Sequence, residues 1–384
     1  MAGHVRKLES GRWMARLPLG GRGRYRSRTF VRKLDAQNWL DAQNVARNRG
    51  EWIDPKAAGE TFYSVADTWL ASRRGKAAST QARDESVVRN LILPYLGAVE
   101  LRHISPEVLD EWVHHLDEVE EKAPATTRKA FQLAGQVLER AVATRRLSAN
   151  PAKVKDAIEL PRIDEDEMRF LSVEEVHRLA ETIGERYRAL ILAAAYSGLR
   201  WGELAGLRRR NLNLDGGKIT VVETLSEVSG HLHHKEPKSK ASIRTVAIPA
   251  GIVSTLEDHL GRWPAIGAAA VFTGPDGGLL RRSAFRSRIW LPAVRSSVSE
   301  PLRFHDLRHS HVAILVAQGA HPKTIQARLG HASISTTLDR YGHLFDGLDQ
   351  AAADALDGVF AEAVKHSGST QRLGSVSEIG PGRR

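Results

Sequence analysis

The sequence contains no cysteine among its 384 residues. Disulfide bonds and cysteine-based zinc sites are therefore excluded, and the composition is compatible with a reducing cytosol. Long apolar runs are also missing, because the longest, ALILAAAY at residues 189–196, is far too short to span a bilayer. The first residues, MAGHVRKLESGRW, lack the apolar core of a signal peptide. We therefore expect a soluble cytoplasmic protein that makes no contact with membranes.

Basic residues are abundant. The chain has 56 Lys and Arg residues against 45 Asp and Glu residues, which gives a net charge of +11 and a pI of about 10.0. This excess favours a polyanionic partner, with nucleic acid ahead of an anionic membrane surface. The length is sufficient for two or three domains with at least one sizeable core.

Residues 1–58 form a small basic module in this interpretation. The segments HVRKLESGRWMARLPL and RYRSRTFVRK alternate apolar and basic residues, which predicts a hairpin or three-stranded sheet, and LDAQNWLDAQNVARNRG predicts a helix. Such a sheet could enter a DNA groove, although a solvated basic module is the alternative. The candidate DNA contacts here are Arg12, Arg16, Arg24, Arg26 and Arg28.

The rest of the chain predicts two further domains. Residues 61–148 show apolar residues at helical spacing and predict a four-helix domain, in which Lys76, Arg83 and Lys129 are candidate DNA contacts or simply solvated charges. A proline-containing linker precedes a mixed α/β domain at residues 170–366, with strands expected within 217–248 and a disordered tail at 367–384. The expected fold is multi-domain and mainly α, with small β-sheets.

The segment RFHDLRHSHVAILVAQGAHPKTIQARLGHASISTTLDRYGHL, residues 303–344, carries the strongest chemical signal. It contains His305, Arg308, His331 and Tyr341 in that order. Arginine matches phosphate oxygens with a two-pronged fork, histidine moves protons near neutral pH, and a tyrosine hydroxyl can form a covalent intermediate. Together these residues predict chemistry on a phosphodiester.

Two upstream motifs add further candidates. In SGLRWGEL, Arg200 follows a helix-ending glycine, and Glu203 lies three residues later, close enough to orient the arginine. In PKSKASIRTVAIP, Lys238 and Lys240 precede a strand. Taken alone, a helix-terminal Arg–Glu pair is usually structural, and a hairpin lysine is usually surface charge.

The four motifs, in this order and spacing, resemble the tyrosine recombinases of the phage integrase family. The layout is similar to lambda-type integrases, which have an arm-binding module, a helical core-binding domain and a catalytic domain. LGHASISTTLDRYGHL is similar to integrases of actinobacterial temperate phages.

The resemblance implies a role for each matching residue. Arg200 and Arg308 would clamp the scissile phosphate, and Tyr341 would be the nucleophile. His305 would assist proton transfer, and His331 would hydrogen-bond the phosphate. Lys238 would be the general acid, preferred over Lys240 because its distance from Arg244 suits the family spacing, and Glu203 would have a supporting role.

The resemblance also implies an activity and partners. The protein would recombine double-stranded DNA at core and arm attachment sites through a 3′-phosphotyrosyl intermediate, integrating and excising phage or mobile-element DNA. It would act as a homotetramer, with a host DNA-bending protein and an excision factor. The rival interpretations are a type IB topoisomerase-like enzyme and a DNA-binding accessory protein with an inactive site.

No cofactor or metal is expected. His231, His233 and His234, placed in a predicted turn, lack partnering cysteines or a clear carboxylate set, so a hydrated loop or a DNA backbone contact is favoured over a metal site. His305 and His309 have the spacing of helical zinc ligands, but the glutamate of the HExxH motif is missing between them.

Overall fold

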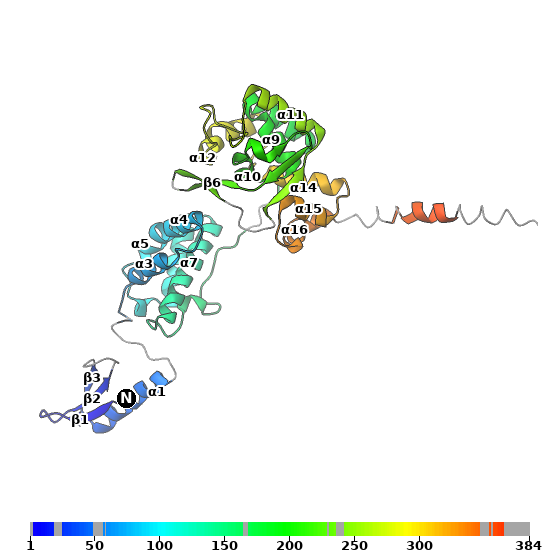
Figure 1. Ribbon diagram of the computed structural model, residues 1–384. Coiled ribbons are helices and arrows are strands. Elements are labelled where there is room, and N and C mark those ends of the chain that lie inside the picture. The colour runs from blue at the N-terminus through cyan, green and yellow to red at the C-terminus, as the bar shows by residue number, and fades with distance from the viewer. Residues whose placement is uncertain are drawn as a thin grey trace, which may run out of the picture. The chain divides into compact units, whose positions relative to one another are not determined.

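The computed structural model describes residues 3–18, 25–48, 57, 59–163, 168–228, 230–235, 242–345, 353–354 and 356–364. The candidates Arg24, Lys238 and Lys240 and the predicted disordered tail lie outside these described residues. The chain divides into two compact units, Met1–Asp166 and Glu167–Arg384. It is mainly helical with small antiparallel sheets, as the sequence predicts (Figure 1).

The first unit begins with the predicted three-stranded sheet and helix. Strands β1 (His4–Lys7), β2 (Trp13–Pro18) and β3 (Tyr25–Phe30) pair antiparallel in sequence order and are followed by α1 (Lys33–Asn48). Ala15 and Leu17 on β2 are fully buried and share a small apolar core with Leu40 of α1. Buried and partly exposed residues therefore alternate along the second half of β2, with Ala15 and Leu17 on the face packed on the helix.

The rest of the first unit is a helical segment with its own apolar core. Its helices are α3 (Phe62–Ser72), α4 (Ala78–Val87), α5 (Leu93–Leu96), α6 (Pro106–His114) and α7 (Pro124–Ala143). Helix α7 contributes a buried stripe at helical spacing, which includes Leu133, Val137 and Ala141. Ser105 caps α6 through a bond from the backbone N–H of Val108.

The second unit is a mixed α/β structure. Its helices are α8 (Val173–Thr182), α9 (Glu185–Ser197), α10 (Trp201–Ala205), α11 (Ala250–Arg262), α12 (Arg282–Phe285), α13 (Leu291–Ser297), α14 (Asp306–Ala317), α15 (Pro322–Leu329) and α16 (Ile334–Tyr341). Its strands are β4 (Leu212–Asn213), β5 (Lys218–Val221), β6 (Thr224–Val228), β7 (His231–Lys235) and β8 (Arg244–Ala247).

Helix α9 is the centre of this unit. Its residues 189–195 are all buried, so the helix is surrounded by neighbours rather than amphipathic. Helix α8 begins with the capping box that the sequence predicts between Ser172 and Glu175. The buried α9 gives a fixed base for the turn that follows it.

The strands form a three-stranded antiparallel sheet in the order β4-β5-β8 and a separate β6–β7 hairpin. The expectation of a turn at the histidine-rich segment is wrong. His231, His233 and His234 lie in strand β7, where alternate side chains and cross-strand pairing with β6 accommodate them. Among the described residues, no helix combines the length and apolar character needed to cross a bilayer.

Candidate active site

A glycine turn joins α9 to the first arginine of the site. Gly198 ends α9 with φ of +69°, in the left-handed region that glycine adopts without strain. A Cβ on Gly198 would lie 2.5 Å from Cδ2 of the His311 ring. Glycine is therefore required here by both backbone conformation and close packing, and Arg200 follows as the residue that starts α10.

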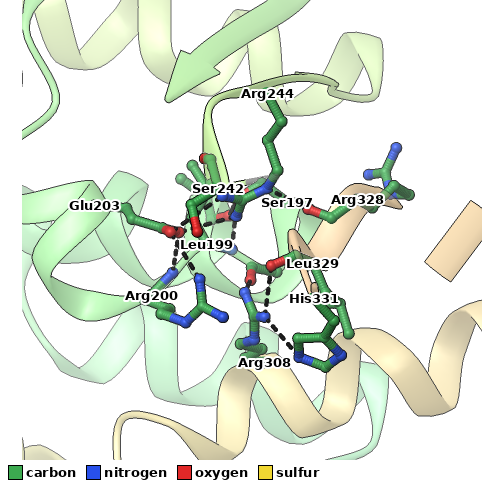
Figure 2. Close-up of polar contacts among 12 residues, drawn as sticks. Ser197, Leu199, Arg200, Glu203, Ser242, Arg244, Arg308, Arg328, Leu329 and His331 are labelled. Atoms are coloured by element: carbon green, nitrogen blue, oxygen red, sulfur yellow. Dashed lines mark hydrogen bonds and ion pairs between the residues drawn. The ribbon is translucent and has the colours of Figure 1, made fainter. Parts of the chain in front are cut away.

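Glu203 is a buried carboxylate held by two arginines. It accepts a 2.8 Å bond from the backbone N–H of Arg200 and a 3.0 Å bond from Nη1 of the same residue. Arg244 of β8 adds two further bonds, of 3.1 and 2.9 Å, one to each carboxylate oxygen (Figure 2). The side chain of Glu203 is only 5% exposed, whereas that of Arg200 is 38% exposed. The carboxylate thus fixes Arg200 while leaving part of its guanidinium accessible.

The pKa of Glu203 reflects two opposing effects. Burial alone would raise it, but the hydrogen bonds and charge of Arg244, together with those of Arg200, hold the pKa below its usual range. Glu203 is therefore ionised at neutral pH. Arg244 also donates a 2.6 Å bond from Nε to the carbonyl of Arg328 in α15, so the carboxylate is tied through it to a third element.

Arg308 is almost completely buried, at 2% exposure. It donates a 2.6 Å bond to the carbonyl of Gly198 and a 2.7 Å bond to the carbonyl of Leu329, which fix it between α9 and α15 (Figure 2). Among the described residues no carboxylate forms an ion pair with it. Burial and then the positive charge of Arg200 lower the pKa of Arg308 from its ordinary value, although a guanidinium stays charged at pH 7. The site therefore holds a buried positive charge that an anion would stabilise.

His331 braces the buried arginine. Nη2 of Arg308 lies 3.1 Å from Nε2 of His331, and since a guanidinium only donates, Nε2 must accept. The ring proton therefore resides on Nδ1, which donates to Oγ1 of Thr337 at 2.9 Å. Gln326 fixes the His331 backbone by donating from its side chain to the His331 carbonyl. The segment between α15 and α16 is thus oriented toward Arg308.

The nucleophile candidate, Tyr341, is the last residue of α16 and is 1% exposed. Its hydroxyl lies 2.8 Å from Nδ1 of His309 on α14. The ring of His305, which directly precedes α14, packs edge-on against the ring of His309, with centroids 5.0 Å apart. Burial raises the pKa of Tyr341, and the positive charges of Arg308, Arg340 and Arg200 oppose that shift.

The histidines around the site are neutral. Burial first, and then neighbouring positive charges, lower the pKa of His305 to about 3 and that of His331 to about 4. Burial also lowers the pKa of His309 to about 4. Each ring therefore has one nitrogen that donates and one that accepts a hydrogen bond at pH 7, and none of them adds to the positive charge of the arginines.

The structure brings most of the predicted site residues into one cluster in the second unit: Arg200, Glu203, His305, Arg308, His331 and Tyr341. Two members were not predicted. Arg244 was used in the sequence only as a spacing reference, although a buried carboxylate after the first arginine implies a second basic partner. His309 was considered only as a zinc ligand, and the described residues contain no cluster of three His, Cys, Asp or Glu that could hold a metal.

The candidate DNA contacts of the sheet lie on different faces. Arg26 and Arg28 pair across the sheet with the buried Leu17 and Ala15, so they lie on the face that carries α1. Arg26 donates to Gln43 of α1. Arg16 alternates with these residues and lies on the opposite face, and Arg12 is exposed just before β2. The predicted arginine-lined face is therefore split by the strand alternation.

The candidates of the helical segment also differ from one another. Lys76 and Arg83 are exposed. Lys129 is 32% exposed, lies 3.7 Å from Oδ1 of the buried Asp84 and donates to Gln132. Lys129 is therefore already part of an internal ion pair.

Models of phage integrase domains match most of the chain. The phage integrase family matches residues 168–347, the phage integrase central domain residues 62–157, and the phage integrase N-terminal domain residues 1–49. The chain belongs to the phage integrase family. As a member of this family it is a site-specific tyrosine recombinase, an enzyme that cuts and rejoins DNA.

Similar proteins include integrases from a mycobacterial phage and from Bacillus subtilis. The integrase of Mycobacterium phage L5 is 27% identical over 369 residues, which cover 92% of this chain and 96% of the phage protein. The ICEBs1 integrase of Bacillus subtilis is 25% identical over 372 residues, which cover 92% of this chain and 99% of that protein. The similarity thus extends over nearly the whole length of these integrases.

Solved integrase structures share the fold. The Tn1549 transposon integrase in complex with a circular intermediate DNA superposes with a TM-score of 0.66 at 18% identity, over 77% of this chain and 99% of that one. A lambda integrase dimer bound to a COC′ core site gives a TM-score of 0.57 at 17% identity, over 89% of this chain and 94% of the integrase chain. At these identities the likeness establishes the fold.

Proposed function

We propose that this recombinase cuts double-stranded DNA by attack of Tyr341 on a phosphodiester that Arg200 and Arg308 bind. The observation that supports this assignment is the excess of buried guanidinium over carboxylate beside Tyr341. Two carboxylates are buried here, and both already have arginine partners: Arg244 occupies both oxygens of Glu203, and Arg303 pairs with Asp306. The buried Arg308 bonds to neutral carbonyls and to a neutral imidazole. A phosphate would therefore supply the missing negative charge.

The geometry suits phosphoryl transfer. Charge grows on the non-bridging oxygens in the transition state, and fixed guanidinium donors in a buried site stabilise it without reorganising, each donor contributing about 3–4 kcal/mol. Arg200 and Arg308 are held in this way by Glu203 and by the carbonyls of Gly198 and Leu329. His331 holds Arg308 with Nε2 as the acceptor, and it would hydrogen-bond the phosphate once Nε2 carries a proton. The general acid for the 5′-oxygen is Lys238, with Lys240 as the alternative.

A covalent tyrosyl intermediate explains how joining needs no external energy source. The 3′-phosphate captured on Tyr341 conserves the phosphodiester bond, so the 5′-hydroxyl of another strand attacks it directly. The recombination of two duplexes requires four such events, and a homotetramer supplies one tyrosine for each. We assign the exchange to attachment sites, with integration and excision of phage or mobile-element DNA in the cytoplasm of a bacterial host.

The other parts of the chain would bind DNA. Residues 61–148 and 170–366 are assigned to the core site, and residues 1–58 to separate arm sites, an assignment supported by the match of residues 1–49 to the phage integrase N-terminal domain. The exposed Arg12 and Arg28 and the half-buried Arg16 are the candidates for arm contact, together with Arg24. A host DNA-bending protein and an excision factor complete the assembly by the same resemblance.

The test is Tyr341→Phe on a nicked duplex that traps the covalent adduct, built from the junctions between the element and its host chromosome. We expect no adduct, because phenylalanine has no nucleophile, and nearly unchanged DNA affinity. Tyr196→Phe is the matched control, since it removes a hydroxyl bonded to His177 in the same unit and should leave the adduct. Adduct formation by Tyr341→Phe, measured on denaturing gels, would refute the assignment.

A further inference from the structure

The hydroxyl of Tyr341 has one side-chain partner in the described part of the chain. That partner is Nδ1 of His309, at 2.8 Å, which is the distance of a normal hydrogen bond. Both side chains are buried, with His309 at 4% and Tyr341 at 1% exposure. Water competes little for this bond, so the bond is stronger than its equivalent at the surface.

The direction of the bond depends on the protonation state and tautomer of His309. Burial lowers the pKa of His309 to about 4; the carboxylate of Asp306 opposes this, and the charges of Arg340, Arg303 and Arg308 reinforce it. These groups belong to α14, to the residues before it and to α16, which carries Tyr341. The ring is neutral at pH 7, and Tyr341 is protonated. Of the two tautomers of the neutral ring, the one with its proton on Nε2 leaves the lone pair of Nδ1 free to accept from the phenol, and this is the tautomer that can take up the phenolic proton.

His309 is placed next to the phosphate clamp along one rigid helix. It follows Arg308 directly in α14, and Arg308 is fixed by the carbonyls of Gly198 and Leu329. A nucleophile and a base within hydrogen-bond distance, both on ordered elements, are the arrangement that activates weak nucleophiles such as phenols. The ring of His305 packs edge-on against the imidazole of His309.

We propose that His309 is a catalytic residue, the base that accepts the phenolic proton of Tyr341 during strand cleavage. This inference rests on the proposed role of Tyr341 as nucleophile and assigns a step to a residue that the sequence motifs left unused. His305, whose ring packs against that of His309, would assist this transfer.

Strand cleavage exchanges one bond to phosphorus for another and moves two protons. The Tyr341 oxygen forms a bond to phosphorus, its proton passes to Nδ1 of His309, and the bond from phosphorus to the 5′-oxygen breaks. The departing 5′-oxygen takes a proton from the general acid, which we assign to Lys238. In the rejoining step a 5′-hydroxyl attacks and returns its proton to the lysine. The bond from phosphorus to the Tyr341 oxygen breaks, and protonated His309 gives its proton back to the phenol.

The experiment measures the rate of adduct formation on the nicked duplex for the full-length chain at saturating DNA. His309→Ala should slow it by on the order of 10²-fold at pH 7, as expected for loss of a general base. His309→Asn should slow it comparably, because the amide accepts a hydrogen bond but not the proton. The defect of His309→Ala should diminish as pH rises, since a more basic solution removes the phenolic proton itself.

A second arm changes the nucleophile. Tyr341→3,5-difluorotyrosine lowers the phenol pKa, so the added cost of His309→Ala should fall below about tenfold in that background. The control is His259→Gln, which alters another buried histidine of the same unit that bonds to the carbonyl of Val271. It should leave the rate unchanged. Thermal unfolding and DNA binding of each variant report whether the fold persists.

The outcomes separate the two assignments. The role of His309 is overturned if His309→Ala stays within about threefold of the wild-type rate, a change too small for loss of a base. It is equally overturned if His309→Asn is fully active, or if the Ala defect is unchanged by pH and by the fluorinated phenol, since each result indicates positioning alone. An adduct with Tyr341→Phe would instead refute the nucleophile itself.

Discussion

Each of the two units contains a buried carboxylate that pairs with two basic side chains, and the two clusters differ in how far the positive charge extends. In the helical segment, Asp84 is 1% exposed and pairs with Arg73 at 2.5 Å and Lys129 at 3.7 Å. In the second unit, Glu203 is 5% exposed and pairs with Arg200 and Arg244. The local arrangement is alike: one carboxylate and two cations on different helices or strands.

The surroundings of the two clusters differ. Besides its ion pair with Asp84, the guanidinium of Arg73 lies over the ring of Trp69, 4.4 Å from its centroid, and bonds to Gln136. Around Glu203 the positive charge continues into Arg308, which is buried without a carboxylate of its own among the described residues. A cluster that stabilises a fold can end with matched partners. A cluster that keeps unmatched buried charge is arranged for an incoming anion.

The largest expected effect is on the rate of adduct formation, which should depend on Arg308 and not on Arg73. Arg308→Ala should lower the rate of adduct formation on the order of 10²–10³-fold, because a fixed donor to the phosphate is lost. Arg73→Ala should leave the rate per bound complex unchanged and lower thermal stability instead. Single-turnover cleavage at saturating DNA, with calorimetry of both variants, makes the measurement. Equal losses of rate would mean that both clusters are structural or that both serve the reaction.

A second pair of variants removes the charge of each buried carboxylate in turn. Glu203→Gln leaves Arg244 buried without its ion-pair partner and should lower the free energy of unfolding by about 3 kcal/mol. Asp84→Asn should cost less, about 1–3 kcal/mol, because Arg73 keeps contact with Trp69 and some solvent. In addition, Glu203→Gln should slow cleavage because Arg200 loses its anchor, whereas Asp84→Asn should not. A normal rate for Glu203→Gln would contradict the supporting role of Glu203.

The pH dependence of stability is a second measurement that tests the role of Glu203. The pKa of Glu203 is lowered in the folded state, so the unfolded chain binds the proton more readily. Its contribution to stability is fully present above the ordinary carboxyl pKa near about 4.3 and is lost as pH falls through the lowered value. Glu203→Gln should therefore flatten the acid side of the stability curve, as followed by calorimetry from neutral pH downward.

The sequence predicted those site residues whose chemical type and motif indicate their role. Arg308, His331 and Tyr341 come from one continuous segment of the sequence and lie on α14, between α15 and α16, and on α16. Glu203 could be assigned to Arg200 because residues three apart share a helix face. The fold class followed similarly, since periodicity reports helices and strands directly.

The site residues that could not be predicted depend on contacts between elements that are distant in the sequence. Arg244 reaches Glu203 across 41 residues, and His309 reaches Tyr341 across 32, which no local pattern encodes. Strand alternation places Arg16 and Arg26 on opposite faces, but only the register with the buried Leu17 shows which face is covered. The histidines of β7 resembled a turn because polar residues are typical of turns, and pairing with β6 overrode that preference.

The smallest effect should separate Lys129 from Arg83, two basic residues of the helical segment that the sequence treats alike. Lys129 pairs with Asp84, whereas Arg83 is exposed on α4 and forms no ion pair among the described residues. If Arg83 contacts a phosphate, Arg83→Met should reduce the slope of log K against log salt concentration by about 0.9, because one fewer counterion is released. Lys129→Met should leave that slope unchanged and lower stability by less than about 1 kcal/mol. Filter binding or fluorescence anisotropy across a salt series measures both slopes. A reduced slope for Lys129→Met would show that this lysine leaves Asp84 to bind DNA. Of the two cations paired with Asp84, only Arg73 would then remain as one with a purely structural role to compare with the arginines around Glu203.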